Sequence, residues 1–208
     1  MIVTTAYWAT LERLDEETQA FYPDVDVEGL VHAIMVDDYR RSLARIYGFV
    51  APLERSLLDT HALDRLIDLR RFRKHILLEH DLQALGLKRT DVEALPQCMW
   101  VPWFDDARVA LGWAYTIERS TLAHATLFRH VASSLPGEAA FAASYLKCYA
   151  GEIAERWSDF GARLDASISG PQDLENIVEA AKAGFRNFRW WRNTFDGKAR
   201  SSPNEPMT

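Results

Sequence analysis

Four polar side chains in the middle of an otherwise apolar stretch are the first candidates for chemistry in this sequence. They interrupt the segment 112–131, whose apolar residues recur at helical spacings. The four are Arg119, Ser120, Thr121 and His124. Because a buried guanidinium needs a partner, the pattern predicts a helix that either lines a cavity or packs against a second, partly polar helix.

Histidine and carboxylate side chains on one helix face could hold a metal ion. His75 and Glu79 are four residues apart, a spacing that places both on one face of a helix. Glu118 and His124 are six residues apart and do not share a face. We therefore assign no metal site from the sequence, and His32 and His124 remain the candidate metal ligands.

Helical periodicity predicts the elements that position these residues. The clearest apolar stripe runs from Tyr39 to Leu57 in steps of four and three, after an acidic start at Asp37. Gly86 marks the end of the next helix, and Gly151 marks a bend or a point of close contact in a later one. We expect helices at about 8–21, 39–57, 63–85, 112–131, 141–164 and 172–195.

The predicted fold class is all-α, because no segment shows the alternating pattern of a strand. A chain of 208 residues with 48% hydrophobic residues can bury one good core. We expect a single multi-helical domain at residues 1–195. The tail at 196–208 has no apolar content to bury and should be disordered.

Charge and cysteine content exclude several classes of protein. The 30 acidic and 24 basic side chains give a net charge of −6, which argues against binding to nucleic acid or anionic membranes. Cys98 and Cys148 form neither a C-x-x-C pair nor a disulfide framework. The sequence shows no signal peptide and no apolar run that could span a membrane. We expect a cytoplasmic protein.

The central segment carries a family resemblance. The sequence GWAYTIERSTLAH at 112–124 resembles the distal helix of the bacterial, biliverdin-producing heme oxygenases, whose usual wording is close to G-x-x-Y-V-L-E-G-S-T-L-G-G. The segments 39–54, 77–87, 95–98, 149–164 and 179–191 resemble the same family in the same order. The resemblance implies a heme-oxygenase-like helical array, in which a histidine of the first helix binds the heme iron and distal glycines leave room opposite it.

Both sides of the implied pocket depart from the family pattern. The position expected for the iron ligand falls at 15–19, which contains no histidine, and His32 is the first histidine of the chain. On the distal helix, three family glycines are replaced by Arg119, Ala123 and His124. The pocket residues implied by the resemblance are Glu16, Glu17, Thr18, Gln19, Arg119, Ser120, Ala123 and His124.

A pocket that has lost its cofactor cannot stay empty at low cost. A volume on the order of 300 to 1,000 Å³, at about 24 cal/mol per Å³, represents roughly 7 kcal/mol or more, comparable with the stability of a whole domain. Our leading hypothesis is that Arg119 and His124 fill this space and that Arg119 pairs with Glu16 or Glu17. The chain would then need no cofactor and would bind an unknown protein partner or another small ligand.

Two alternatives stay open. The chain could be an active heme oxygenase that converts heme to biliverdin, CO and iron with O2 and electrons from a reductase, and Arg156 and Arg163 could then hold the heme propionates. It could also be a non-heme iron oxidase on the same fold. Separately, Trp100 and Trp103 flank a proline in a crossing segment, where an exposed pair would mark a site for a protein partner.

Overall fold

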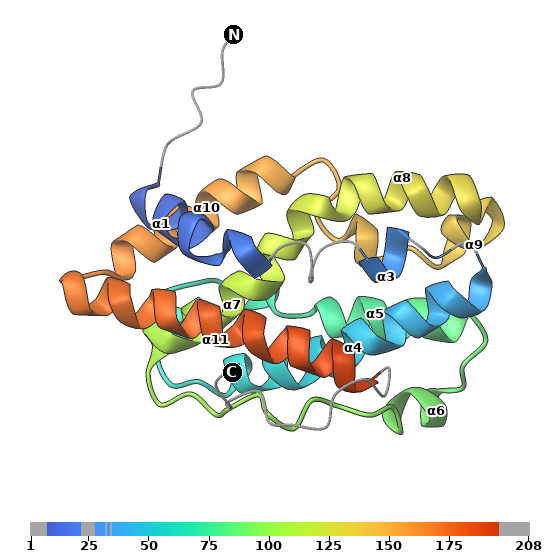
Figure 1. Cartoon of the computed structure of the whole chain (residues 1–208), viewed down its shortest axis with the longest axis horizontal. Helices are drawn as coiled ribbons and strands as arrows, with labels where there is room; N and C mark the ends of the chain where they lie inside the picture. Colours follow the sequence, from blue (N-terminus) through green and yellow to red (C-terminus); the bar gives the residue numbers. More distant parts are fainter. Residues whose placement is uncertain (1–7, 22–27, 32, 34, 196–208) are drawn as a thin grey trace, which may run out of the picture.

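Helices of different lengths pack around one central helix in the computed structural model of this chain (Figure 1). The structure describes residues 8–21, 28–31, 33 and 35–195. Every regular element within those ranges is an α-helix or a short 3-10 helix, so the all-α prediction is confirmed. The tail predicted at 196–208 lies outside the described residues.

The elements follow one another along the chain with short connections. The α-helices are α1 (Ala9–Thr18), α3 (Glu28–Val31), α4 (Val36–Leu58), α5 (Lys74–Ala84), α6 (Arg89–Glu93), α7 (Ala107–Ser120), α8 (His124–Ser134), α9 (Pro136–Phe141), α10 (Ile153–Ser167) and α11 (Pro171–Phe195). The 3-10 helices are η1 (Gln19–Phe21), η2 (Leu63–Arg65), η3 (Leu69–Arg71), η4 (Thr121–Ala123) and η5 (Tyr145–Lys147).

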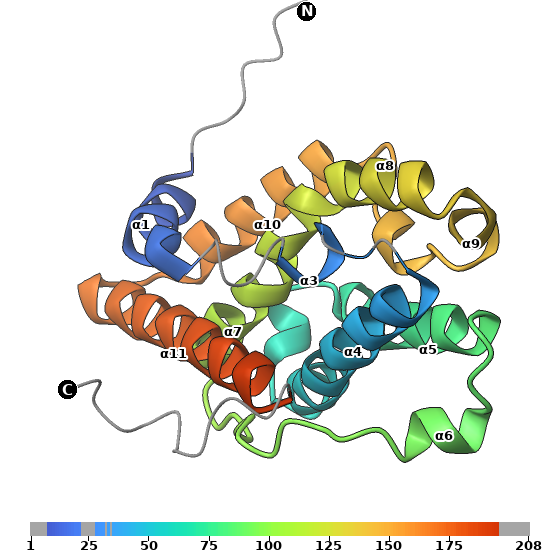
Figure 2. The same ribbon diagram turned by 45° about the vertical axis from the view of Figure 1, so that its right-hand side comes forward.

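Helix α7 lies in the middle of the fold, and two views place it beside α11 (Figure 1, Figure 2). Residues 110–118 of α7 are all buried. Gly112 allows the close approach of the two helices, because a Cβ atom there would collide with the carbonyl oxygen of Ile177 and the Cβ of Ala180. The central helix therefore depends on a small residue at its contact with α11.

Replacing Gly112 with valine should lower the free energy of unfolding by about 1–3 kcal/mol, the usual effect of overpacking a core. Urea denaturation would measure the change. Gly137→Ala is the matched control, since no atom lies within 4 Å of a Cβ placed there. A Gly112→Val protein as stable as the wild type would contradict the close packing of α7 and α11.

Helix α1 rests on α10 and α11. Its buried residues include Leu11, Leu14 and Thr18, which share one face of the helix. Gly161 of α10 lies under this helix, and a Cβ atom there would collide with the side chains of Trp8 and Leu11. The packing fixes the rotation of α1 about its axis and so determines where its carboxylates point.

The predicted helix at 63–85 is wrong in its first half. The segment forms η2 and η3, and α5 begins only at Lys74. Ala62 has a left-handed backbone with a φ of 60°, and the Asp68 side chain accepts the backbone N–H of Arg70. These local contacts compete with a continuous helix.

The predicted helices at 141–164 and 112–131 are both interrupted. At Ser144 and Tyr145 the backbone N–H groups donate to the buried carboxylate of Asp81, and Gly151 has a φ of 84°. The central helix changes to the 3-10 form over η4, between α7 and α8. By contrast, α4 and α11 match their predicted ranges closely.

No helix of the described residues is long and apolar enough to cross a membrane.

Candidate functional site

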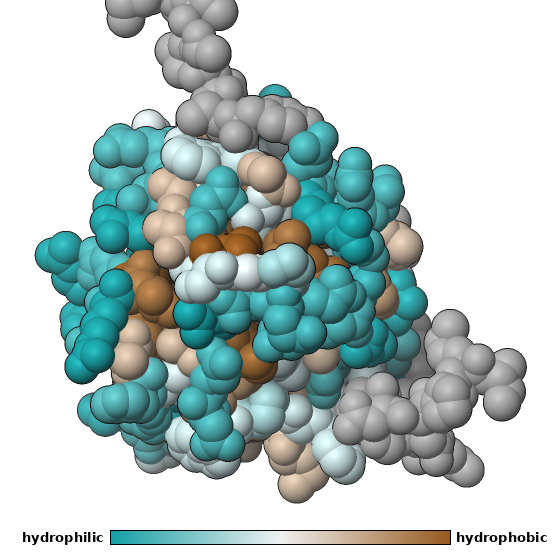
Figure 3. Space-filling view, turned by 90° about the vertical axis from the view of Figure 1, so that its left-hand side faces the viewer, coloured by the Kyte–Doolittle hydropathy of each residue, from teal (hydrophilic) through white to brown (hydrophobic). Residues whose placement is uncertain are grey.

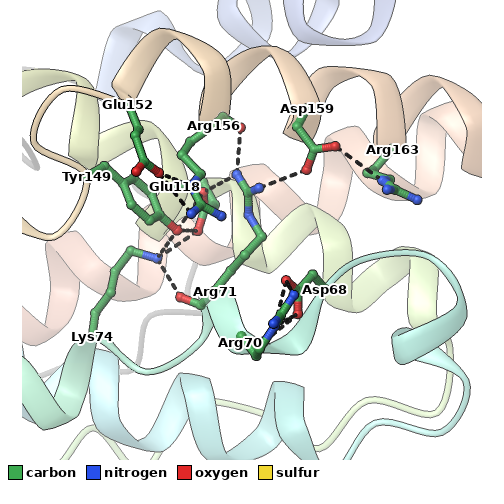
Figure 4. Close-up of polar contacts among 10 residues, drawn as sticks. All are labelled: Asp68, Arg70, Arg71, Lys74, Glu118, Tyr149, Glu152, Arg156, Asp159 and Arg163. Atoms are coloured by element: carbon green, nitrogen blue, oxygen red, sulfur yellow. Dashed lines mark hydrogen bonds and ion pairs between the residues drawn. The ribbon is translucent and has the colours of Figure 1, made fainter.

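A buried cluster of charged side chains surrounds Glu118, near the C-terminal end of α7 (Figure 4). Glu118 Oε2 lies 2.9 Å from Arg71 Nη2, and Glu118 Oε1 lies 2.7 Å from Lys74 Nζ. These three side chains are at most 2% exposed. Tyr149 donates its hydroxyl to Glu118 Oε1 at 3.1 Å. We call Arg71, Lys74, Glu118 and Tyr149 the Glu118 cluster.

The cluster stays ionised because its charges compensate one another. Burial alone would raise the pKa of Glu118, but Lys74 and Arg71 hold it below its ordinary value. Burial would likewise lower the pKa of Lys74, but Glu118 raises it above its ordinary value. Burial and the neighbouring carboxylate raise the pKa of Tyr149 to about 12. At neutral pH the cluster holds no group poised to accept or release a proton.

The cluster also ties the core to α10. Arg71 Nη1 lies 3.0 Å from the half-exposed Asp159, and Arg71 Nη2 donates to the carbonyl oxygen of Arg156 at 2.6 Å. Arg71, Lys74 and Tyr149 were not among the residues predicted from the sequence. These contacts hold α5, α7, α10 and η3 together.

His124 is buried and neutral. It is 2% exposed, its ring centroid lies 4.6 Å from that of Tyr145, and its Nδ1 lies 3.5 Å from Cys148 Sγ. Burial, followed by the nearby Lys74, lowers the pKa of His124 to about 3. Burial raises the pKa of the Cys148 thiol to about 12. The ring therefore packs inside the fold beside an inert thiol.

Arg119 points toward the first helix. Its Nε lies 3.5 Å from Asp15 Oδ1, and the Arg119 side chain is 16% exposed. The sequence predicted a carboxylate partner on this helix but named the wrong residues, Glu16 and Glu17. The contact links α1 to α7.

The other residues of the expected ligand position are engaged elsewhere. Glu17 pairs with Lys182 of α11 and with Arg13, each at 2.6 Å. Thr18 is fully buried and donates its hydroxyl to the carbonyl oxygen of Leu14. Gln19 donates to the carbonyl oxygen of the exposed Glu16. None of these residues carries an imidazole ring. Thr18 and Gln19 donate hydrogen bonds to backbone carbonyl oxygens of α1.

Two further pocket candidates are the last residue of α7 and the last residue of η4. Ser120 donates its hydroxyl to the carbonyl oxygen of Ile117 at 2.9 Å, and Ala123 packs at the edge of the core. Ala123 does not leave the open backbone that the glycine of the family pattern would provide, because it carries a side chain.

The proposed propionate ligands on α10 are paired with carboxylates four residues earlier in the chain. Arg156 Nη2 lies 2.9 Å from Glu152, and Arg163 Nε lies 3.4 Å from Asp159. Figure 4 shows Arg156 beside the Glu118 cluster and Arg163 farther along α10, next to Asp159. These are ordinary pairs of residues four apart on a helix.

The candidate metal ligands do not come together. His75 lies 2.6 Å from Glu54, whereas Glu79 accepts the hydroxyl of Tyr47. His32 lies outside the described residues. Within the described part of the chain, no group of three or more histidine, cysteine, aspartate and glutamate side chains could hold a metal ion.

A cleft of about 760 Å³ opens between α1, η4 and α10. Its apolar walls are formed by Trp8, Leu11, Leu122, Ile153 and Trp157. Three carboxylates also line it: Glu12, Asp15 and Glu16. The molecular face made by α1, α10 and the start of α11 is mostly hydrophilic, with hydrophobic side chains near its middle (Figure 3). The cleft between α1, η4 and α10 thus has apolar walls and an acidic lining.

The segment between α6 and α7 exposes aromatic and thioether side chains. Trp103 is 69% exposed and Met99 is 84% exposed, whereas Trp100 packs edge-on against Trp190 of α11. The partner site at Trp100 and Trp103 stays a prediction.

Comparison with known proteins relates the chain to one family. A family model described as heme oxygenase matches residues 9–194. The chain is similar to the solved structure of NO- and CO-bound heme oxygenase from Neisseria meningitidis, with a TM-score of 0.74 and 22% identity over 95% of this chain and 98% of that chain. At this identity the structural likeness establishes the fold alone. A search of curated proteins found no match.

Proposed function

Since this chain belongs to the heme oxygenase family, we propose that it keeps the family's fold without cleaving heme, and that it binds a different small ligand in the cleft between α1, η4 and α10. The observation that carries the proposal is the ion pair between Arg119 of α7 and Asp15 of α1. The carboxylate of Asp15 stands in the interval where the family resemblance implies an iron ligand, and the guanidinium of Arg119 replaces a glycine of the distal helix.

The described residues do not fit a histidine-ligated heme. Helix α1 contains no histidine. His124 replaces a family glycine, but its ring is enclosed by Tyr145 and Cys148 rather than presented to the cleft. Heme carries two anionic propionates, and the charged residues that line the cleft are all carboxylates. Like charges in one partly buried site repel.

A hemin titration tests the proposal. We expect no stoichiometric Soret band of histidine-ligated heme and no biliverdin when hemin, a reductant and O2 are supplied. A His32→Ala variant serves as the matched control, because His32 is the one histidine near the first helices in the sequence. A one-to-one Soret complex of histidine-ligated heme, or biliverdin formation by the wild type, would overturn the proposal, and loss of that complex in His32→Ala would identify His32 as the ligand.

A further inference from the structure

We propose that the cleft between α1, η4 and α10 binds an amphipathic organic cation, a molecule with an apolar body and a quaternary or protonated amine. The inference rests on the proposed function, since it assigns a ligand class to the same cleft. Two observations carry the inference: the walls of the cleft are apolar, and the charged side chains that line it are negative.

The walls suit an apolar body. Leu11, Leu122 and Ile153 contribute aliphatic surface, and Trp8 and Trp157 contribute indole rings. The rings are held in place: Trp8 Nε1 donates to Ser158 at 3.3 Å, and Trp157 packs against Tyr115 at 5.8 Å between centroids. Indole faces attract organic cations more strongly than other aromatic rings do.

The charged lining selects a cation. Glu12, Asp15 and Glu16 lie on one helix and are the charged residues that line the cleft. Asp15 is paired with Arg119 at 3.5 Å, so its carboxylate contributes less to the charge of the wall than Glu12 and Glu16 do. An anionic ligand would meet like charge there, whereas an ammonium group would meet opposite charge.

The size of the cleft favours a whole organic molecule. A volume of about 760 Å³ lies within the range of small-molecule pockets. A bare metal ion would leave most of the apolar wall without contacts. The described residues also hold no cluster of metal-ligating side chains.

Calorimetric titration of the full chain with three probes tests the inference. The probes are octyltrimethylammonium, octanol and octanoate, which have alkyl chains of eight, eight and seven carbons and differ in charge. We expect the ammonium compound to bind at least about tenfold more tightly than octanoate, with octanol between them, since two or three partly exposed charge contacts supply about that factor.

Two variants locate the binding. The double variant Glu12→Gln/Glu16→Gln should weaken binding of the ammonium probe about tenfold and leave octanol binding unchanged. Asp64→Asn/Glu175→Gln is the matched control, because it makes the same change in net charge at exposed residues that do not line the cleft. Ala154→Trp, which fills the cleft from an exposed position of α10, should reduce binding of all three probes.

Several outcomes would overturn the inference. Octanoate binding as tightly as the ammonium probe would remove the charge preference, and unchanged binding by both Glu12→Gln/Glu16→Gln and Ala154→Trp would place the probe elsewhere. A dimer in sedimentation that Ala154→Trp dissociates would assign the cleft to a second copy of the chain. The hemin titration reports separately on the proposed function, so the failure of one is distinguishable from the failure of the other.

Discussion

Replacing Glu118 with alanine is expected to lower the free energy of unfolding by about 3–5 kcal/mol, the usual effect of removing one partner from a buried ion pair. Arg71 and Lys74 would keep their positive charges at exposures of 1% and 2%, with no carboxylate between them. Equilibrium urea denaturation, followed by far-ultraviolet circular dichroism, measures the loss.

The control for this prediction removes another carboxylate from the same guanidinium. Asp159 lies 3.0 Å from Arg71 but is 44% exposed, so Asp159→Asn should cost no more than about 1 kcal/mol. Glu118→Gln separates charge from shape, because it keeps the side-chain volume and one acceptor but removes the buried negative charge that Arg71 and Lys74 share. If Glu118→Ala lowered the free energy of unfolding less than Asp159→Asn did, the Glu118 cluster would not stabilise the core as its burial indicates.

The long helices could be predicted from the sequence because their signal is local and redundant. In α4 every turn contributes a buried residue to one apolar stripe. A single residue that departs from the pattern therefore does not change the predicted helix. The break at 142–152 depends instead on a distant group. Asp81 captures the backbone N–H groups of Ser144 and Tyr145, and no pattern within 141–164 reveals that contact.

The partner of Arg119 shows where sequence reasoning ends within the site. Leu11, Leu14 and Thr18 define the buried stripe of α1, which places Asp15 and Glu17 on its two flanks. Which flank faces Arg119 depends on how α1 packs between α10 and α11. In the structure Glu17 faces Lys182 and Asp15 faces Arg119.

The Glu118 cluster had one detectable signal. Glu118 is the last of nine consecutive buried residues, 110–118, and it falls on the apolar pattern of the central helix. A carboxylate there requires buried cationic partners. Their identity could not be read from the sequence, because Arg71 and Lys74 lie more than forty residues away and resemble surface residues.

Acidification should destabilise the wild type more than a His124→Gln variant. His124 has a pKa of about 3 in the folded protein against an ordinary 6.5, because burial and then Lys74 disfavour its charged form. Between these values the unfolded chain binds a proton that the folded chain does not, so stability is fully present above pH 6.5 and falls as the pH is lowered. At about 1.4 kcal/mol per pH unit, the wild type should lose roughly 2–3 kcal/mol more than His124→Gln between pH 6.5 and pH 4.5.

Urea denaturation of both proteins across this pH range measures the difference, and contributions from the carboxylates and the other histidines cancel in it. His61→Gln is the matched control, since it removes an exposed histidine. Parallel pH profiles for the wild type and His124→Gln would show that the imidazole is solvated and able to take a proton, as a ring open to the cleft would be. A steeper loss of stability in the wild type would mean that packing against Tyr145 and Cys148 keeps His124 neutral. The residue that replaces a distal glycine would then belong to the core, and the cleft would stay open to other ligands.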